Sequence, residues 1–183
     1  KVVERLMPSK HKSDEEFQLM YISSGRVGAS ELNIAQAEKE ISVFAERVQR
    51  MLGMAKDLVH TKENSEDFTN LFTRLEKYED IADRMEVEIA NYLNRCAEGR
   101  LSSDSKHRIA SLLRIVSEVE SIADGCFGVA KAMMRKQQGK VEFPELIYNN
   151  IDSMLEYVDG AMNNMMSLLS DVENARESEI IIS

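Results

Sequence analysis

The chain has 183 residues, enough to bury one hydrophobic core. Its formal net charge of -9 argues against nucleic acid as a partner, because nucleic-acid binding depends on clustered lysine and arginine. Only 8 glycines and 2 prolines are present, while 43% of the residues are hydrophobic and 30% are charged, a composition that favours long helices in a folded chain.

Residues 1–29 are expected to form a linker outside the core. Pro8 and two glycines interrupt any helical period here, and residues 14–19 are expected to form either one turn of helix or an extended strap. The basic residues Lys10 and Lys12 are typical of chain that leaves a membrane helix on its cytoplasmic side. No apolar run in the sequence itself reaches the roughly 18–20 residues that such a helix needs.

Apolar residues then recur in alternating steps of three and four over three stretches, near 30–60, 64–98 and 103–138. This period is typical of helices that pack nearly antiparallel through short loops. The repeating positions are Ile34, Ala37, Ile41, Phe44, Val48, Met51, Ala55 and Leu58, then Phe68, Leu71, Leu75, Tyr78, Ala82, Met85, Ile89, Tyr92 and Cys96, then Ile109, Leu112, Val116, Val119, Ala123, Cys126, Ala130 and Met133. Almost complete burial is expected for Phe44, Leu75, Met85, Val116, Val119 and Ile122. The sequence therefore predicts an all-α fold, with an antiparallel up-down-up three-helix bundle over residues 30–140.

A fourth helix is expected to begin near Pro144, within a segment spanning residues 141–183 that ends before any further helix. Three closely spaced methionines in this helix suggest either a soft-metal site or core filling, and core filling is the commoner role at helical spacing. The methionines are Met162, Met165 and Met166, and the expected apolar stripe is Ile147, Ile151, Met154, Val158, Met162, Met165, Leu169 and Val172.

Residues that commonly carry catalysis are sparse. Cys96 and Cys126 fall on apolar helix faces, which predicts buried thiols, and the chain has no CxxC motif that would indicate a zinc site. His11, His60 and His107 stand apart from one another, and the sequence lacks HExxH, GxSxG and a glycine-rich phosphate loop. The chain is therefore not expected to be an enzyme.

Two acidic motifs of the form Glu-x-x-x-Asp stand out, Glu79 with Asp83 and Glu120 with Asp124. Spacing of four residues places both carboxylates on one side of a helix. Such pairs usually form a solvated face. The second motif, however, interrupts an apolar stripe, and an unpaired buried carboxylate costs several kcal/mol. Antiparallel neighbours bring the motifs level, and a cation bridging them is one way to relieve the repulsion.

These motifs resemble PhoU proteins. Residues 120–124, followed by Phe127-Gly128-Val129-Ala130, are similar to the family's third-helix signature, and residues 79–86 are similar to its second-helix motif. The resemblance implies two three-helix repeats, of which residues 141–183 begin the second. It also implies that these motifs hold a multinuclear cluster of iron, zinc or nickel. The ligands would be Glu79, Asp83, Glu120 and Asp124, with Asp80 and Glu86 as further candidates.

A wider stretch, including residues 17–24, 30–37 and 79–102, resembles the cytoplasmic PhoU-like tail of bacterial Na+/phosphate cotransporter proteins. This resemblance implies a regulatory or binding domain on the cytoplasmic side of the membrane, with the transporter domain of the same polypeptide as its partner and a homodimer as a further assembly. The alternative is a freestanding PhoU-type regulator of phosphate uptake that acts by protein–protein contact. A carboxylate-bridged di-metal enzyme is disfavoured, because it commonly uses Glu-x-x-His and no histidine lies on the acidic faces.

Overall fold

The computed structural model describes residues 16–23 and 31–182, with side chains described as far as Ser170. Four long helices make up the fold: α1 (Glu31–His60), α2 (Glu66–Ala97), α3 (Ser103–Gly139) and α4 (Glu145–Ile182). Within this described part there is no β-strand, so the predicted all-α class is confirmed. The rest of the predicted linker, residues 1–15 and 24–29, lies outside the described residues.

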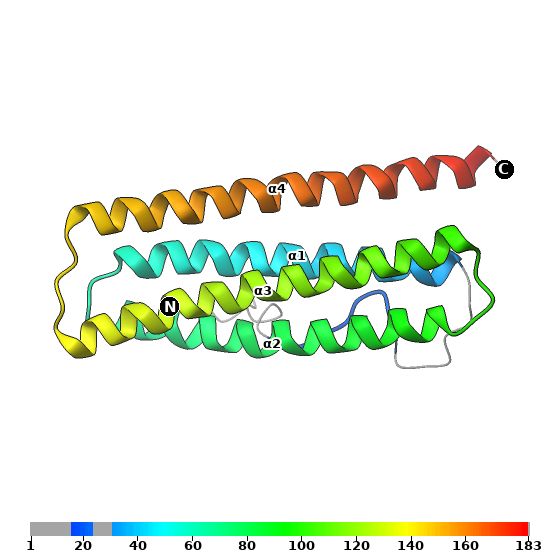
Figure 1. The fold of residues 1–183 in the computed structure, drawn as a ribbon. Coiled ribbons are helices and arrows are strands. Elements are labelled where there is room, and N and C mark those ends of the chain that lie inside the picture. Colours follow the sequence, from blue (N-terminus) through cyan, green and yellow to red (C-terminus); the bar gives the residue numbers. More distant parts are fainter. Residues whose placement is uncertain (1–15, 24–30, 183) are drawn as a thin grey trace, which may run out of the picture.

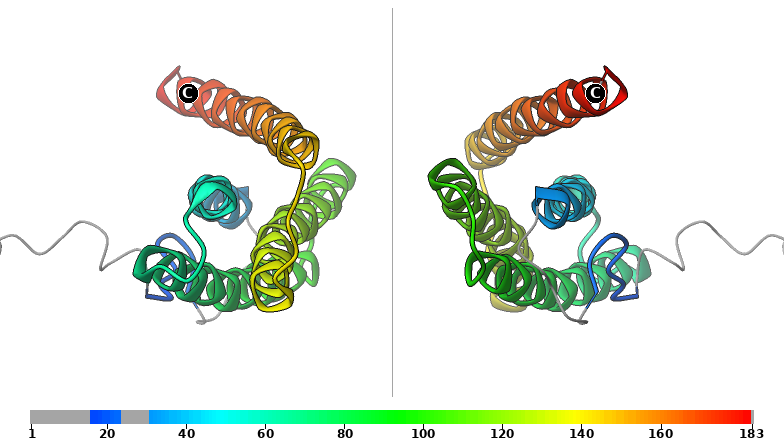
Figure 2. Two further views of the ribbon diagram at one scale, coloured as in Figure 1. Left: turned by 90° about the vertical axis from the view of Figure 1, so that its left-hand side faces the viewer. Right: turned by 90° about the vertical axis from the view of Figure 1, so that its right-hand side faces the viewer.

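The helices run up and down in turn, and α1, α2 and α3 pack against one another around a shared core (Figure 1). Helix α4 lies along α1, on the side away from α2 (Figure 2). In the described stretches of the chain, no helix is apolar enough over sufficient length to cross a membrane.

Serine caps set two of the helix starts. The Ser65 hydroxyl accepts a hydrogen bond from the Phe68 backbone N–H at 3.1 Å, and Ser102 does the same for Ser105 at 3.1 Å. Each cap satisfies a first-turn donor that has no partner inside its helix. Helix α3 ends at Gly139, and the left-handed backbone conformation falls on the next residue, Lys140, with a φ of 51°.

The predicted apolar stripes of the first three helices are buried as expected, except that Leu71 is half-buried. Of the six residues expected to be almost wholly buried, Phe44, Leu75, Met85, Val116 and Val119 are at most 1% exposed. The prediction was wrong for Ile122, which is half-buried, while its neighbour Ala123 is fully buried. The inward stripe of α3 steps four residues from Val119 to Ala123, which leaves Ile122 on its flank.

The predicted stripe of α4 was partly wrong. Ile147 and Met154 are 37% and 68% exposed, while Leu155, which was not predicted, is 7% exposed. Helix α4 runs along α1 and, among the described residues, contacts α3 only near its own start. A single partner helix covers a narrower stripe than the two partners that surround each core helix. The methionine cluster packs inward as core filling: Met162 is buried, and Met165 and Met166 are half-buried against the core.

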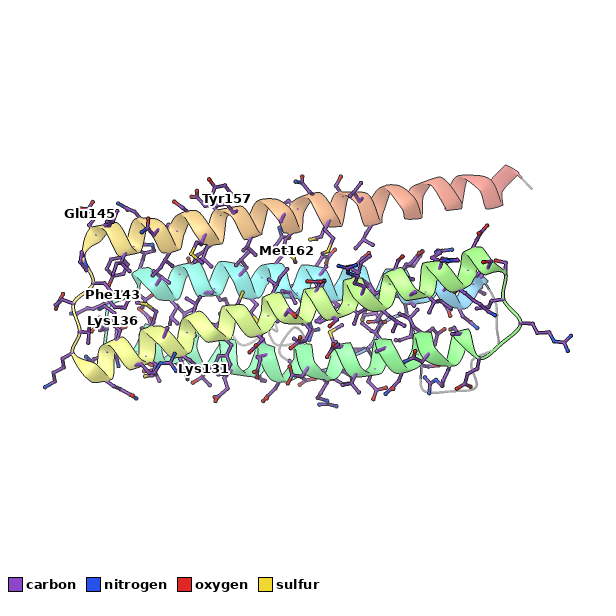
Figure 3. All side chains as sticks on the ribbon, in the orientation of Figure 1. Lys131, Lys136, Phe143, Glu145, Tyr157 and Met162 are labelled. Carbon is purple, nitrogen blue, oxygen red and sulfur yellow. The ribbon has the colours of Figure 1, made fainter. Side chains whose placement is uncertain are left out.

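The junction between α3 and α4 is fixed by Lys136, which is 6% exposed. Its ammonium forms an ion pair with Glu63 and lies over the rings of Phe143 and Tyr148, at 5.4 and 6.0 Å from their centroids. Figure 3 shows Lys136 and Phe143 close together at this end of the bundle. The hydrogen bond from Lys136 to Glu63 raises the pKa of the Lys136 ammonium. The chain therefore enters α4 at a defined place on the bundle.

Residues 16–23 form an extended strap on the bundle, so residues 16–19, the described part of the predicted segment 14–19, confirm the extended alternative. The Glu40 carboxylate, fully buried in α1, accepts the backbone N–H groups of Met20, Tyr21 and Ile22, with its Oε2 at 2.8, 2.6 and 3.3 Å. Arg47, two turns further along the same side of α1, donates a hydrogen bond to the Glu16 carbonyl at 3.2 Å. Two buried charges of α1 thus hold the strap by its backbone.

Candidate functional site

The two predicted motifs lie beside each other where α2 and α3 pack. We call the six carboxylates of Glu79, Asp80, Asp83, Glu86, Glu120 and Asp124 the acidic face. Ala82 and Ala123, which are 1% and 0% exposed, lie on the same helical turns and allow the two helices to approach closely. The three aspartates are exposed, and the three glutamates are half-buried between the helices.

The pKa of Glu79 shows that the carboxylates of the acidic face interact electrostatically. Burial is the main cause that raises the pKa of its carboxyl group, and repulsion from Asp83 is the next. Asp80 and Asp124 raise the pKa further, and Lys131 lowers it. Because Asp124 belongs to α3, its charge acts on Glu79 across the interface between α2 and α3.

Glu120 shows the same effect from the other side. Burial raises the pKa of its carboxyl group most, followed by repulsion from Glu86 and Asp83 of α2, and then from Asp124 of its own helix. A hydrogen bond with Ser121 acts in the opposite direction. The structure therefore brings all six predicted residues into one electrostatic cluster.

Lys131 is a site residue that the sequence analysis missed. It acts on Glu79, and its ammonium lies over the Phe127 ring at 4.5 Å from the centroid (Figure 3). Phe127 in turn contacts Phe72 of α2, with the ring centroids 5.7 Å apart. The signal was present in the sequence, because Lys131 follows Asp124 by two helical turns and shares its side of α3.

The donor groups of the acidic face decide whether a metal cluster fits there. Among the residues that the structure describes, no three carboxylate, imidazole or thiolate groups form a set that could hold a metal ion. The donors are all carboxylates, which suit hard cations, and they form an acidic surface and not a preformed coordination shell. Binding of iron, zinc or nickel stays a prediction.

The other titratable candidates have structural contacts. His60 interacts with Asp152 of α4 through Nε2 at 2.7 Å, and His107 contacts the Ser103 carbonyl through Nδ1 at 2.8 Å. Burial raises the pKa of both thiols, that of Cys126 to about 12. A thiol with such a pKa is a poor nucleophile at neutral pH. His11 lies outside the described residues.

Two of the hollows on the surface of the described residues bear on ligand binding. One, of about 190 Å³, adjoins the acidic face and is lined by Asp83, Arg84, Val87 and Glu88. The other, of about 310 Å³, lies at the end of the bundle and is lined by Val59, His60, Thr61, Lys62, Glu63 and Tyr148. Small-molecule sites commonly measure about 300–1,000 Å³ and are mostly apolar. The hollow beside the acidic face is smaller than that range and carries three charged residues.

The raised pKa values predict a pH dependence of stability. The folded chain binds protons at Glu79 and Glu120 more tightly than the unfolded chain, so their contribution to stability grows as the pH falls from neutrality towards the ordinary value of 4.5. We expect the melting temperature to rise from this source as the pH falls from 7 to 5. A Glu79→Gln, Glu120→Gln variant should lose this rise and melt higher at pH 7. The control is Glu118→Gln, an exposed site on α3. Calorimetry showing the same pH slope in the double variant and the parent would contradict the coupling.

The PhoU domain family matches residues 41–133 of the chain. This range begins in the third turn of α1 and contains all of α2 and most of α3, so every residue of the acidic face and Lys131 lies within it. No curated protein and no solved structure matches the chain.

Proposed function

The chain belongs to the PhoU domain family, a family of phosphate-uptake regulators, and we propose on this basis that it acts by binding another protein through the acidic face. The observation that carries the proposal is the gathering of six carboxylates from two helices, inside the matched range, on one side of the bundle. A surface of this kind favours a partner segment rich in lysine or arginine, since complementary charge sets both specificity and the rate of association.

A binding role agrees with the chemistry of the described residues better than a catalytic role does. Both thiols are buried with raised pKa values, and His60 is engaged by Asp152. The half-buried glutamates bring a cost, because burial, and after it the neighbouring carboxylates, disfavour the charged form of Glu79 and Glu120. A cationic partner lowers that cost, so the acidic face gains more from binding one than an isolated carboxylate does.

One observation supports the more specific proposal that the chain is a cytoplasmic domain joined to a Na+-coupled phosphate transporter. Residues 16–23 are held to α1 by Glu40 and Arg47, so a membrane segment before the strap would be connected to the bundle at a fixed point. In this reading the partner of the acidic face is the transporter domain of the same polypeptide. The coding sequence upstream of Lys1 distinguishes the two readings, because only the fused form places membrane helices there.

The test is phosphate uptake in cells from which the gene has been deleted. Re-expression of the parent chain should restore regulated uptake. A variant with Glu79→Gln, Asp83→Asn, Glu120→Gln and Asp124→Asn should not restore it, and its uptake rate should differ from that of the deletion strain at least tenfold less than the parent's rate does. A matched control changes four exposed acidic residues elsewhere: Glu66, Glu98, Glu118 and Glu156, each to glutamine. Both variants should fold, because each change keeps the shape of the side chain. Equal regulation by the parent and the acidic-face variant would overturn the proposal.

A further inference from the structure

The strap contacts α2 as well as α1. Figures 1 and 2 show residues 16–23, in blue, beside both helices. The Phe17 ring, which is half-buried against the core, lies under the guanidinium group of Arg84 on α2, with the Cζ atom 4.0 Å from the ring centroid. A cation this close to the face of an aromatic ring is attracted by the ring. The strap therefore sets the position of one exposed cation of α2.

Arg84 is within reach of the acidic face. Arg84 and Asp83 line the same hollow of about 190 Å³, and Val87 lies between them around the helix. Asp80 precedes Arg84 by four residues, the spacing at which a carboxylate and a cation pair on a helix, and the acid comes first, which is the more favourable order. The guanidinium group therefore has an alternative partner in the acidic face.

The structure does not show Arg84 with that partner. Among the described residues, no ion pair joins Arg84 to a carboxylate, and its guanidinium group lies over Phe17. Lys131 acts on the pKa of Glu79, whereas Arg84 is not among the main charges that act on the pKa of Glu79 or Glu120. While the strap is in place, the charge of Arg84 is thus kept at the edge of the acidic face.

The contact between Phe17 and Arg84 depends on the attachment of the strap to α1. On one side of Phe17, the Glu16 carbonyl accepts a hydrogen bond from Arg47. On the other side, the Glu40 carboxylate accepts the backbone N–H groups of residues 20–22. Because Phe17 lies between these two attachments, its ring stays under Arg84 only while the strap is docked. Any event that detaches the strap also releases Arg84.

We propose that the strap regulates the acidic face through Arg84. When the strap is docked, Phe17 holds the guanidinium group and the acidic face is open to a cationic partner. When the strap is detached, Arg84 pairs with Asp80 and reduces the negative charge that the partner meets. This regulation rests on the proposed function of the acidic face as a binding surface. Because such coupling is reciprocal, a bound cationic partner also favours the docked strap.

The expected effect is modest. Pairing with Asp80 neutralises one of the six carboxylates of the acidic face. Exposed ion pairs at this spacing and exposed contacts between a cation and a ring change an equilibrium constant by about two- to fivefold. We therefore expect a cationic peptide to bind about threefold more weakly when Arg84 is released. The measurement needs low ionic strength, about 10 mM, where charges act over about 30 Å.

The experiment measures the binding of a decalysine peptide to the 183-residue chain by calorimetry. Phe17→Leu removes the ring but keeps an apolar side chain, so the strap stays docked while Arg84 is released, and the peptide should bind about threefold more weakly. In an Arg84→Gln background the same change should leave the affinity unaltered, because no cation is released. The control is Phe143→Leu, which removes a ring from beneath Lys136 at the end of the bundle and should not alter the affinity.

Two further measurements follow the strap itself. Glu40→Ala, which detaches the strap, should weaken decalysine binding about threefold only where Arg84 is present. In the parent chain, saturating decalysine should slow hydrogen exchange of the amides of residues 20–22 about threefold, as reciprocity requires. The proton signal of the Arg84 Nε–H group, which lies near the Phe17 ring, should shift in both the Phe17→Leu and the Glu40→Ala chains.

The outcomes separate this regulation from the proposed function. If the acidic-face variant binds decalysine as tightly as the parent does, the proposed function is overturned and the regulation with it. If that variant loses binding while Phe17→Leu binds as tightly as the parent, the regulation alone is overturned. An equal loss from Phe17→Leu with and without Arg84 would also overturn the regulation, because the ring would then act through the fold and not through the guanidinium group.

Discussion

Replacing Glu40 with alanine is expected to detach residues 16–23 from the bundle and to lower the free energy of unfolding by about 2–3 kcal/mol. The Glu40 carboxylate is fully buried and is the acceptor for the backbone N–H groups of Met20, Tyr21 and Ile22. Without it, three donors would lose their acceptor in a partly buried site, so the strap gains by moving out into solvent. Ile22, which is 7% exposed in the intact fold, would lose its packing at the same time.

Hydrogen exchange measures this result directly, through the amides of Met20, Tyr21 and Ile22. In the Glu40→Ala chain these amides should exchange at rates close to those of an unstructured peptide, while amides in the middle of α2 keep their protection. Glu40→Gln retains one acceptor oxygen and should give an intermediate rate. Glu46→Ala, an exposed change on the same helix, should leave the three amides protected. Unchanged exchange in the Glu40→Ala chain would show that the carboxylate does not hold the strap.

Replacing Leu75 with alanine is expected to destabilise the bundle by about 2–4 kcal/mol, through lost apolar burial and the cavity that remains. Leu75 is 0% exposed and lies in α2, which packs against both α1 and α3. For a chain of this size the loss corresponds to a fall in melting temperature of roughly 10 °C.

Leu71 provides the matched comparison for this prediction. It lies one turn earlier on the same helix, has the same side chain and is half-buried. Leu71→Ala should therefore cost less than half as much as Leu75→Ala in a denaturant titration, since it removes less buried surface. Equal losses at the two positions would indicate that the core is centred elsewhere.

The sequence predicted α1, α2 and α3 well because each of these helices packs on at least two others. Under that condition a broad apolar stripe becomes a buried stripe, and every position of the repeating stripes predicted for α1 and α3 is buried, although Ile122 of α3, which was also expected to be buried, is half-buried. The same reasoning placed Ile147 and Met154 of α4 inside, and both are exposed. The periodicity of a helix shows that it has an apolar side but not how many partners cover that side.

The acidic face was predictable as a set of residues, because spacing of four places each motif on one side of its helix. The balance of charge on the acidic face could not be predicted, since the influence of Lys131 on Glu79 depends on how α2 and α3 pack side by side. Glu40 and Arg47 were missed although they interrupt the apolar stripe of α1. Their partners are backbone groups of a strap without any periodic pattern, so the sequence offered nothing to pair them with.

The place of α1 between α4 and the rest of the bundle has a consequence for communication between α4 and the acidic face. Beyond the contact of Lys136 with Tyr148, the described part of α4 packs on α1 alone, whereas the acidic face is built on α2 and α3. Allosteric coupling is reciprocal and needs an element that both ligands bias. Helix α1 is that element, because it contacts α2, α3 and α4 and also holds the strap. Coupling between α4 and the acidic face is therefore expected to pass through α1 or through the contact of Lys136 on α3 with Tyr148.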